Sequence, residues 1–328
     1  MRIGVAGAGA FGAALAVTLA QAGRDVTLWA RDTGAVERMR ATRQAERLPE
    51  IDLPARIDPV SDLAALFDCD TILLALPAQA TRGFVTAHRD ALSGKVLVAC
   101  AKGIDLTSLT GQTAIIAHAV PSATPALLTG PSFAADIARA LPTALTLACA
   151  DEACGAALQA ALSTPTLRLY RTADVIGAEL GGALKNVIAI ACGACIGAGL
   201  GDSARAALMT RGFAEMQRLA ASLGARPDTL MGLSGFGDLV LTCSSPQSRN
   251  MSLGLALGEG QTVEQALAGK RSVAEGYQSA PAVRDLGMKL GLDMPIAYGV
   301  AALLAGEATV DQIIEGLLSR PLRAETDG

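Results

Sequence analysis

The chain has 328 residues, of which 51% are hydrophobic and only 3% aromatic, and its formal net charge is −4. This length allows two domains of ordinary size. The weakly acidic balance, without a basic block, argues against a nucleic-acid partner. The longest uncharged stretch of the second half, residues 186–201, is shorter than the roughly twenty apolar residues that cross a bilayer. We therefore expect a soluble, cytoplasmic protein that does not insert into a membrane.

The chain begins with an apolar strand at 2–6 that leads directly into the sequence GAGAFG at 7–12, and a helical segment follows. Gly7 permits the tight turn, Gly9 lets the backbone approach a pyrophosphate, and Gly12 lets the helix pack on the sheet. The helix N-terminus offers N–H groups and a partial positive charge to phosphates. This pattern predicts a dinucleotide-binding site formed by Gly7, Gly9, Ala10, Phe11 and Gly12.

The same N-terminal stretch has features of a secretory signal peptide, because a positive residue and an apolar run end in small residues at 20–22. The glycine spacing and a second strand at 26–30 favour the nucleotide-binding interpretation, since a βαβ unit needs both.

The end of that second strand bears on the choice of cofactor. An acidic residue there would hold the ribose 2′-hydroxyl of NAD, whereas an arginine would pair with the 2′-phosphate of NADP. Arg31 comes first and Asp32 follows. NADP is therefore favoured, and use of both cofactors stays open.

Strand-like and helix-like segments alternate through the first half, which predicts an α/β, Rossmann-like domain over 1–173 with a mostly parallel sheet. Its further strands are expected at 70–74, 95–99, 125–129, 143–147 and 167–170. Beyond it the spacing of apolar residues is helical, which predicts an all-α domain over 174–328. Its helices are expected at 174–197, 203–223, 262–269, 275–290, 296–305 and 310–318.

Only five of the 27 basic residues are lysines, and two of these lie where a charge is unexpected. Lys102 follows a buried strand, in a loop where ligands of such sheets bind. Lys185 and Glu179 are the only charges between Asp174 and Asp202. A partly buried lysine has a lowered pKa and can act as acid or base, unlike arginine. The alternative for either lysine is a surface side chain that extends to solvent.

Two further segments combine turns with polar side chains. Ser132, after the turn at Gly130, is expected to cap the next helix, to contact a ligand, or to do both. Arg249 and Asn250, with hydroxyls at 242 and 248, would suit a phosphate group. Asp238 could orient a lysine or a substrate hydroxyl, and the alternative for this stretch is a solvated loop with a helix cap.

Seven cysteines are present, and Cys192 and Cys195 form a C-x-x-C pattern. A zinc site would need a second pair of ligands, and a redox pair would lie at the mouth of a βαβ unit. Because this pair lies in an apolar helical segment, we expect buried thiols in a reducing compartment and no metal.

The assembled blocks resemble the bacterial NAD(P)-dependent sn-glycerol-3-phosphate dehydrogenase family over nearly the whole chain. The resemblance rests on GAGAFG, LWARD, AKGI around Lys102, GPSFA, LKNVIAI around Lys185, GFGDLVLTC, QSRN and AEGYQ around Glu275. It implies reduction of dihydroxyacetone phosphate by NAD(P)H for phospholipid synthesis. It also implies a helical domain like the C-terminal domain of 6-phosphogluconate dehydrogenase. A homodimer is left open.

The resemblance also implies roles for individual residues. Lys185 matches the general acid/base, and Lys102 matches a contact to both substrate and cofactor. The implied substrate-binding positions are Lys102, Gly130, Ser132, Lys185, Asp238, Ser248, Arg249 and Asn250. The implied cofactor-binding positions are Phe11, Arg31, Lys102, Ala134, Arg249, Val273 and Glu275. Phe11 departs from the Trp or Tyr usual in the family, and residues 192–199 are less polar than its pattern.

Two other classes of protein share part of this pattern. A two-domain hydroxyacid dehydrogenase or ketoacid reductase would keep the first domain and Lys185 but would not need Arg249 and Asn250 for a phosphate. A regulatory nucleotide sensor would bind the dinucleotide without needing a lysine for proton transfer.

Overall fold

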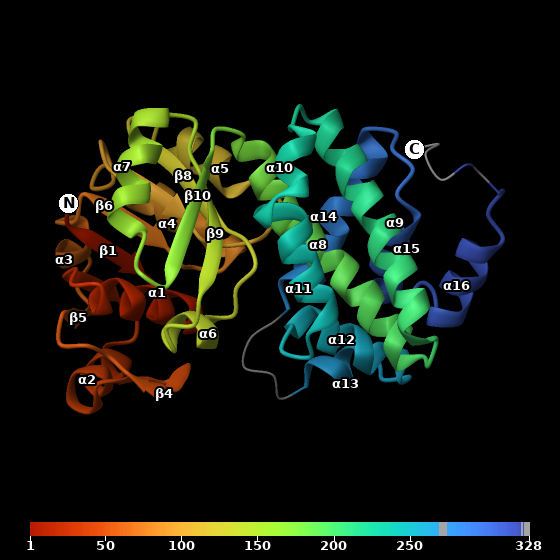
Figure 1. Ribbon diagram of the computed structural model, residues 1–328, viewed down its shortest axis with the longest axis horizontal. Helices are drawn as coiled ribbons and strands as arrows, with labels where there is room; N and C mark the ends of the chain where they lie inside the picture. The colour runs from red at the N-terminus through yellow and green to blue at the C-terminus, as the bar shows by residue number, and fades with distance from the viewer. Residues whose placement is uncertain (269–273, 323, 325–328) are drawn as a thin grey trace. The chain divides into compact units, whose positions relative to one another are not determined.

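The computed structural model describes residues 1–268, 274–322 and 324. The chain divides into two compact units, whose elements are labelled in Figure 1. The first unit comprises Met1–Ala101 and Thr110–Val175, and the second comprises Lys102–Leu109 and Ile176–Gly328. The segment Lys102–Leu109 thus belongs to the second unit although both of its chain neighbours belong to the first.

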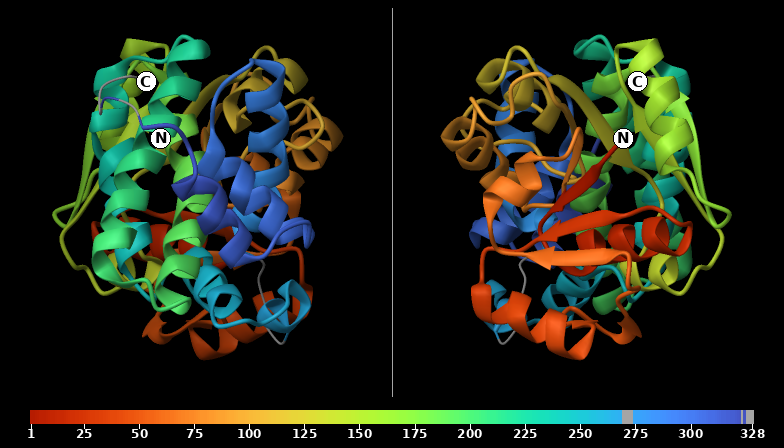
Figure 2. Two further views of the ribbon diagram at one scale, coloured as in Figure 1. Left: turned by 90° about the vertical axis from the view of Figure 1, so that its right-hand side faces the viewer. Right: turned by 90° about the vertical axis from the view of Figure 1, so that its left-hand side faces the viewer.

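The first unit is built on an eight-stranded sheet with the strand order β10-β9-β8-β7-β6-β1-β2-β5. All pairings are parallel except that of β8 with β9, which confirms the prediction of a mostly parallel sheet. Figure 2 shows the first strands, red to orange, side by side. The bounds are β1 (Ile3–Ala6), β2 (Val26–Trp29), β5 (Ile57–Val60), β6 (Thr71–Leu74), β7 (Val96–Ala99), β8 (Thr124–Thr129), β9 (Thr143–Ala148) and β10 (Leu167–Thr172).

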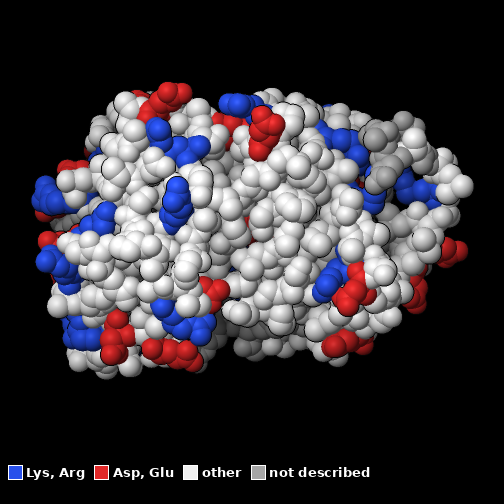
Figure 3. Space-filling model, in the orientation of Figure 1, with Lys and Arg blue, Asp and Glu red and all other residues white. Residues whose placement is uncertain are grey.

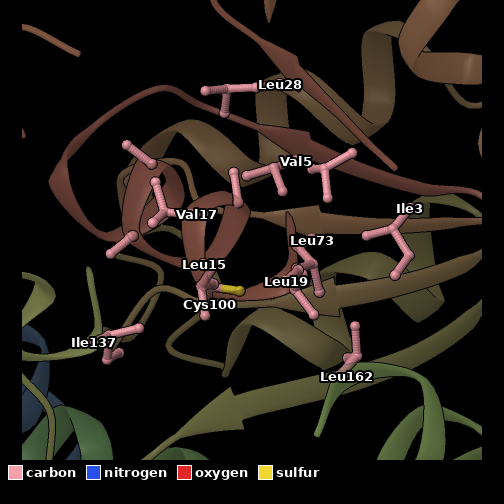
Figure 4. Packing of buried hydrophobic residues seen from close by; sticks show 14 of the residues in the cluster. Ile3, Val5, Leu15, Val17, Leu19, Leu28, Leu73, Cys100, Ile137 and Leu162 are labelled. Atoms are coloured by element: carbon pink, nitrogen blue, oxygen red, sulfur yellow. The ribbon is translucent and has the colours of Figure 1, made fainter. Parts of the chain in front are cut away.

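Helix α1 (Ala10–Gln21) is the central helix of this unit, and its residues from Gly12 to Ala20 are all buried. Figure 4 shows Leu15 and Leu19 of α1 in the hydrophobic core, which also contains Leu73 of the sheet. Small and branched aliphatic side chains thus fill this core, as the composition requires. The other helices are α2 (Thr33–Thr42), α3 (Leu63–Phe67), α4 (Ala78–Ala87), α5 (Gln112–Ala119), α6 (Ala134–Ala138) and α7 (Glu152–Leu162).

Three strands were not predicted from the sequence. Strand β5 contains Asp58 and Pro59, which disfavour a central strand, and it forms the edge of the sheet beside β2. Strands β3 (Gln44–Ala45) and β4 (Leu48–Asp52) form a short antiparallel pair outside the main sheet. Edge and peripheral strands lack the continuous apolar runs that identify buried ones.

Apart from the irregular segment Lys102–Leu109, the regular elements of the second unit are helices in the part of the chain that the structure describes. Its elements are α8 (Val175–Gly197), α9 (Gly201–Ser222), α10 (Pro227–Met231), the π-helix η1 (Leu233–Gly237), α11 (Asp238–Ser244), α12 (Arg249–Gly258), α13 (Val263–Leu267), α14 (Glu275–Lys289), α15 (Pro295–Ala305) and α16 (Val310–Leu318). The polar stretch around Asp238 is therefore helical rather than a solvated loop. Helix α8 is long and apolar enough to span a membrane, but 83% of its most apolar window is buried inside the protein.

Helices α8 and α12 pack with their backbones in contact at glycines. A Cβ added to Gly193 would overlap the carbonyl oxygen of Met251, and one added to Gly254 would overlap that of Ile190. Larger side chains would force the two helices apart. The close packing brings the first residues of α12 next to the middle of α8.

The charged side chains on the face shown in Figure 3 are of both signs and are intermixed. Among the residues that the structure describes, this face shows no basic patch of the kind that binds nucleic acid.

Candidate active site

The turn between β1 and α1 leaves space for a ligand at the helix N-terminus. Gly7 has φ of +112°, and a Cβ there would lie 2.5 Å from the carbonyl oxygen of Ala75. A Cβ at Gly12 would overlap the carbonyl oxygen of Gly7, whereas one at Gly9 would have no described atom within 4 Å. The space at Gly9 therefore leaves room for a ligand next to the N-terminus of α1, and this fits a dinucleotide pyrophosphate.

Beyond β2, Arg31 is exposed and Asp32 is the N-cap of α2. The Asp32 carboxylate accepts a hydrogen bond from the Ala35 N–H at 3.1 Å. One oxygen of the acid is thus engaged in helix capping, while the neighbouring guanidinium extends into solvent.

In the second unit, a buried carboxylate holds two lysines. The Lys185 ammonium on α8 lies 2.6 Å from Oδ1 of Asp238, and the Lys102 ammonium lies 2.8 Å from Oδ2. Lys185 also donates to the Thr242 hydroxyl at 2.7 Å. Asp238 and Thr242 are four residues apart on α11 and so face the same side of that helix. Lys185 is 6% exposed and Asp238 is 1% exposed.

Burial lowers the pKa of Lys185 to about 8, with Asp238 opposing this effect and Lys102 adding to it. An amine with a pKa in this range can both donate and recover a proton near neutral pH. The two ammonium groups share one carboxylate, so their positive charge is only partly neutralised. This cluster is suited to stabilise a developing alkoxide.

A chain of amide hydrogen bonds joins four segments next to the lysines: residues 102–109, α8, α12 and α14. Asn186 donates to the carbonyl oxygen of Lys102 at 3.2 Å, and Asn250 donates to Oδ1 of Asn186 at 2.8 Å. The N–H of Gly276, in the first turn of α14, donates to Oδ1 of Asn250 at 2.8 Å. The start of α14 is thereby fixed beside α8.

Glu275 stands at the beginning of α14, and burial raises the pKa of its carboxyl against the lowering effect of Arg249 and the two lysines. Its Oε2 lies 3.5 Å from Nδ2 of Asn186. Val273, expected at the cofactor, lies outside the described residues.

The residues expected to hold a phosphate differ in their exposure and in their contacts. Ser248 is the N-cap of α12, and its hydroxyl accepts the Met251 N–H at 3.2 Å. Arg249 is exposed in the first turn of that helix. Asn250 is 7% exposed and engaged in the amide chain. The Thr242 hydroxyl accepts a hydrogen bond from the Lys185 ammonium, and this contact was not predicted. The i, i+4 spacing from Asp238 is the signal that could have indicated it.

Gly130, Ser132 and Ala134 belong to the first unit, after β8. Gly130 has φ of +127°, so only glycine fits this turn without strain. The Ser132 hydroxyl donates to the carbonyl oxygen of Gly130 at 3.3 Å. The N-cap of α6 is Phe133, so the expectation that Ser132 caps this helix was wrong.

The seven cysteines are free thiols, and Cys192 and Cys195 are buried on α8, as expected for an apolar helical segment.

The sequence-predicted residues thus fall into two groups. The second unit brings together the lysines, Asp238 and the start of α12 with Glu275, and the first unit holds the glycine turn, Arg31 and residues 130–134. A nucleotide-binding turn and a buried lysine with a pKa near neutrality are typical of the two-unit NAD(P)-dependent dehydrogenases.

Comparison with known proteins supports an NAD(P)-dependent dehydrogenase and identifies the family within that class. Residues 2–155 match the N-terminus model of NAD-dependent glycerol-3-phosphate dehydrogenase, and residues 174–315 match the C-terminus model. The chain is 57% identical over 326 residues to "Glycerol-3-phosphate dehydrogenase [NAD(P)+]" of Ruegeria sp. (strain TM1040), covering 99% of this chain and 100% of the relative. It is 57% identical over 328 residues to the protein of that name from Caulobacter vibrioides, covering 99% and 98%.

The crystal structure of glycerol-3-phosphate dehydrogenase from Coxiella burnetii superposes with a TM-score of 0.93 at 35% identity, covering 97% of this chain and 99% of that one. The chain belongs to the glycerol-3-phosphate dehydrogenase family.

Proposed function

We propose that this protein catalyses the reversible NAD(P)H-dependent reduction of dihydroxyacetone phosphate to sn-glycerol 3-phosphate. It would do so in the cytoplasm and supply glycerophospholipid synthesis. The observation that carries the proposal is the buried Lys185 ammonium, held by Asp238 and Thr242 with a pKa of about 8. A dehydrogenase needs such a group to exchange a proton with the substrate oxygen.

The glycine turn and the N-terminus of α1 would hold the pyrophosphate of the cofactor. Bound NAD(P)H would supply the hydride for C2 of the substrate. The exposed Arg31 favours NADPH because its guanidinium can pair with a 2′-phosphate. Further cofactor contacts are proposed for Ala10, Phe11, Lys102, Ala134, Arg249, Val273 and Glu275.

Lys185 would act as the general acid in the direction of reduction. Its ammonium has three N–H bonds, and Asp238 and Thr242 accept two of them. The third can point to the substrate oxygen and deliver the proton as the alkoxide forms. Lys102 and the Asn186 amide would stabilise the negative charge on that oxygen, and preorganised donors of this kind contribute several kcal/mol.

The phosphate of the substrate would bind at the start of α12. Arg249 offers a planar guanidinium, and the first-turn N–H groups add a partial positive charge. Ser248 caps this turn, and Asn250 ties it to α8. In the first unit, Gly130 and Ser132 are proposed as additional substrate contacts.

The proposal is tested by following absorbance at 340 nm with purified protein and dihydroxyacetone phosphate, using NADPH and NADH in parallel. Oxidation of either cofactor is expected, with NADPH preferred. An unphosphorylated 2-ketoacid serves as the control and should give no turnover. If both cofactors bind but neither is oxidised with dihydroxyacetone phosphate, the proposal is wrong.

A further inference from the structure

The segment Lys102–Leu109 is fixed to the second unit by its own apolar side chains. Ile104 is 2% exposed and belongs to the hydrophobic core of that unit, and Leu109 packs against the same core. The chain enters this segment from β7 and leaves it toward α5, and both are elements of the first unit. The segment 102–109 is therefore an irregular loop, and Ile104 anchors it in the core of the second unit.

Asp105 holds the segment 102–109 in a compact turn. This residue is 3% exposed, and its Oδ2 accepts hydrogen bonds from the Ser108 N–H at 2.8 Å, the Ser108 hydroxyl at 2.8 Å and the Thr107 N–H at 3.2 Å. The carbonyl oxygen of Asp105 also accepts the Leu109 N–H at 2.9 Å. A buried carboxylate with these partners fixes the local backbone, because leaving them unpaired would be costly.

Lys102 lies three residues before Asp105, and contacts fix both its side chain and its backbone carbonyl group. Its ammonium is 2.8 Å from Oδ2 of Asp238, and its carbonyl oxygen accepts the Asn186 amide at 3.2 Å. The conformation of this turn therefore determines whether the Lys102 ammonium reaches the Asp238 carboxylate, which also binds Lys185.

We propose that Asp105 and Ile104 are positioning residues that keep Lys102 on Asp238 and thereby set the alkaline limit of the reduction. The inference rests on the proposed function, since it assigns these residues to the proton transfer by Lys185. Neither residue is expected to touch the substrate or the cofactor.

The charges around Lys185 support this assignment. Asp238 and the Cys243 thiol face it from α11, Lys102 from the segment 102–109, and Glu275 from α14, with Arg249 of α12 beside Glu275. Lys102 lowers the pKa of Lys185 by repulsion. If Lys102 moved away, this repulsion would vanish and Asp238 would act on Lys185 alone. Both changes raise the pKa of Lys185, so the pH at which reduction activity is lost would move upward.

The test compares Asp105→Ala with Asp105→Asn and with Asp151→Ala. Asp151 is a matched control because its carboxylate also fixes a local turn, accepting the Cys154 N–H at 2.8 Å at the start of α7. In Asp105→Ala the alkaline limit of kcat should move up by roughly half a pH unit or more. Its kcat/KM for dihydroxyacetone phosphate should fall on the order of tenfold or more. Asp105→Asn retains a hydrogen-bond acceptor and should largely restore both values, and Asp151→Ala should change neither.

An Asp105→Ala variant that loses thermal stability but keeps the alkaline limit of the parent protein would overturn the proposal. If this variant does not fold, Ile104→Ala replaces it, with the same expected shift and the same contradicting result.

A second readout separates this proposal from the proposed function. The chain has only five lysines, so the titration of Lys185 can be followed by NMR of ¹³C-labelled lysine, with Lys185→Arg for assignment. A raised pKa in Asp105→Ala supports the positioning role even if dihydroxyacetone phosphate is not the substrate. An unchanged pKa contradicts the positioning role whatever the substrate.

Discussion

Lys185 and Asp238 are 53 residues apart in the sequence and form a buried ion pair of 2.6 Å. The other oxygen of Asp238 is occupied by Lys102, so one carboxylate serves two ammonium groups. Burial and, to a smaller extent, repulsion by Lys102 lower the pKa of Lys185 to about 8, against the raising effect of Asp238. The pair therefore places an ammonium that can lose its proton in the middle of a largely apolar helix.

The charge of Asp238 should control the pH range of the enzyme. Reduction needs the Lys185 ammonium, so the rate of the unmodified protein should fall as pH rises through about 8, and glycerol phosphate oxidation should rise through the same pH. Asp238→Asn retains hydrogen-bonding atoms but removes the charge that raises this pKa. The alkaline limit of reduction should therefore move to lower pH, and kcat at pH 8 should fall on the order of a hundredfold. An unchanged pH profile would show that Asp238 does not govern Lys185.

Arg249 should act mainly in binding the phosphate. Arg249→Ala should raise KM for dihydroxyacetone phosphate by roughly tenfold or more, because a charged hydrogen-bonded pair is lost. The weak turnover of dihydroxyacetone, which lacks the phosphate, should change little. Arg168→Ala on β10, which removes another exposed arginine, is the matched control. An equal loss with both ketones would place the phosphate site elsewhere.

Glu215 should make stability depend on pH away from the active site. Its carboxylate accepts the N–H groups of Ile296 at 2.7 Å and Ala297 at 3.0 Å at the start of α15. Burial raises its pKa from 4.5 to about 7, against these hydrogen bonds.

Because the folded state holds this proton more tightly, the stabilising contribution is complete below pH 4.5 and is lost as pH rises to about 7. Over this range the free energy of unfolding of the unmodified protein should decrease by up to a few kcal/mol relative to that of Glu215→Gln. Urea unfolding of both proteins measures this difference. Parallel pH curves for the two proteins would mean that folding does not change the pKa of Glu215.

The features that the sequence predicted best are local ones. The turn at Gly7 and the buried helix α1 follow from glycine spacing and an unbroken apolar run, which need no distant partner. Lys185 was identifiable because a charge inside an apolar helix requires a reason.

Features that depend on tertiary contacts were not accessible from the sequence. The attachment of residues 102–109 to the second unit depends on Ile104 entering a core formed mainly by residues more than seventy positions later. The contact of Thr242 with Lys185 and the engagement of Asn250 by Asn186 likewise join separate helices. Strand β5 was missed because Pro59 is tolerated only where the sheet ends.

The most direct measurement is the steady-state rate of dihydroxyacetone phosphate reduction by Lys185→Ala, with NADPH binding measured on the same sample. Lys289→Ala, which removes an exposed lysine of α14, is the control. The account predicts that Lys185→Ala binds NADPH normally and loses most of kcat, on the order of a hundredfold or more, whereas Lys289→Ala retains full activity. A near-normal kcat in Lys185→Ala would contradict the assignment of Lys185 as the proton donor.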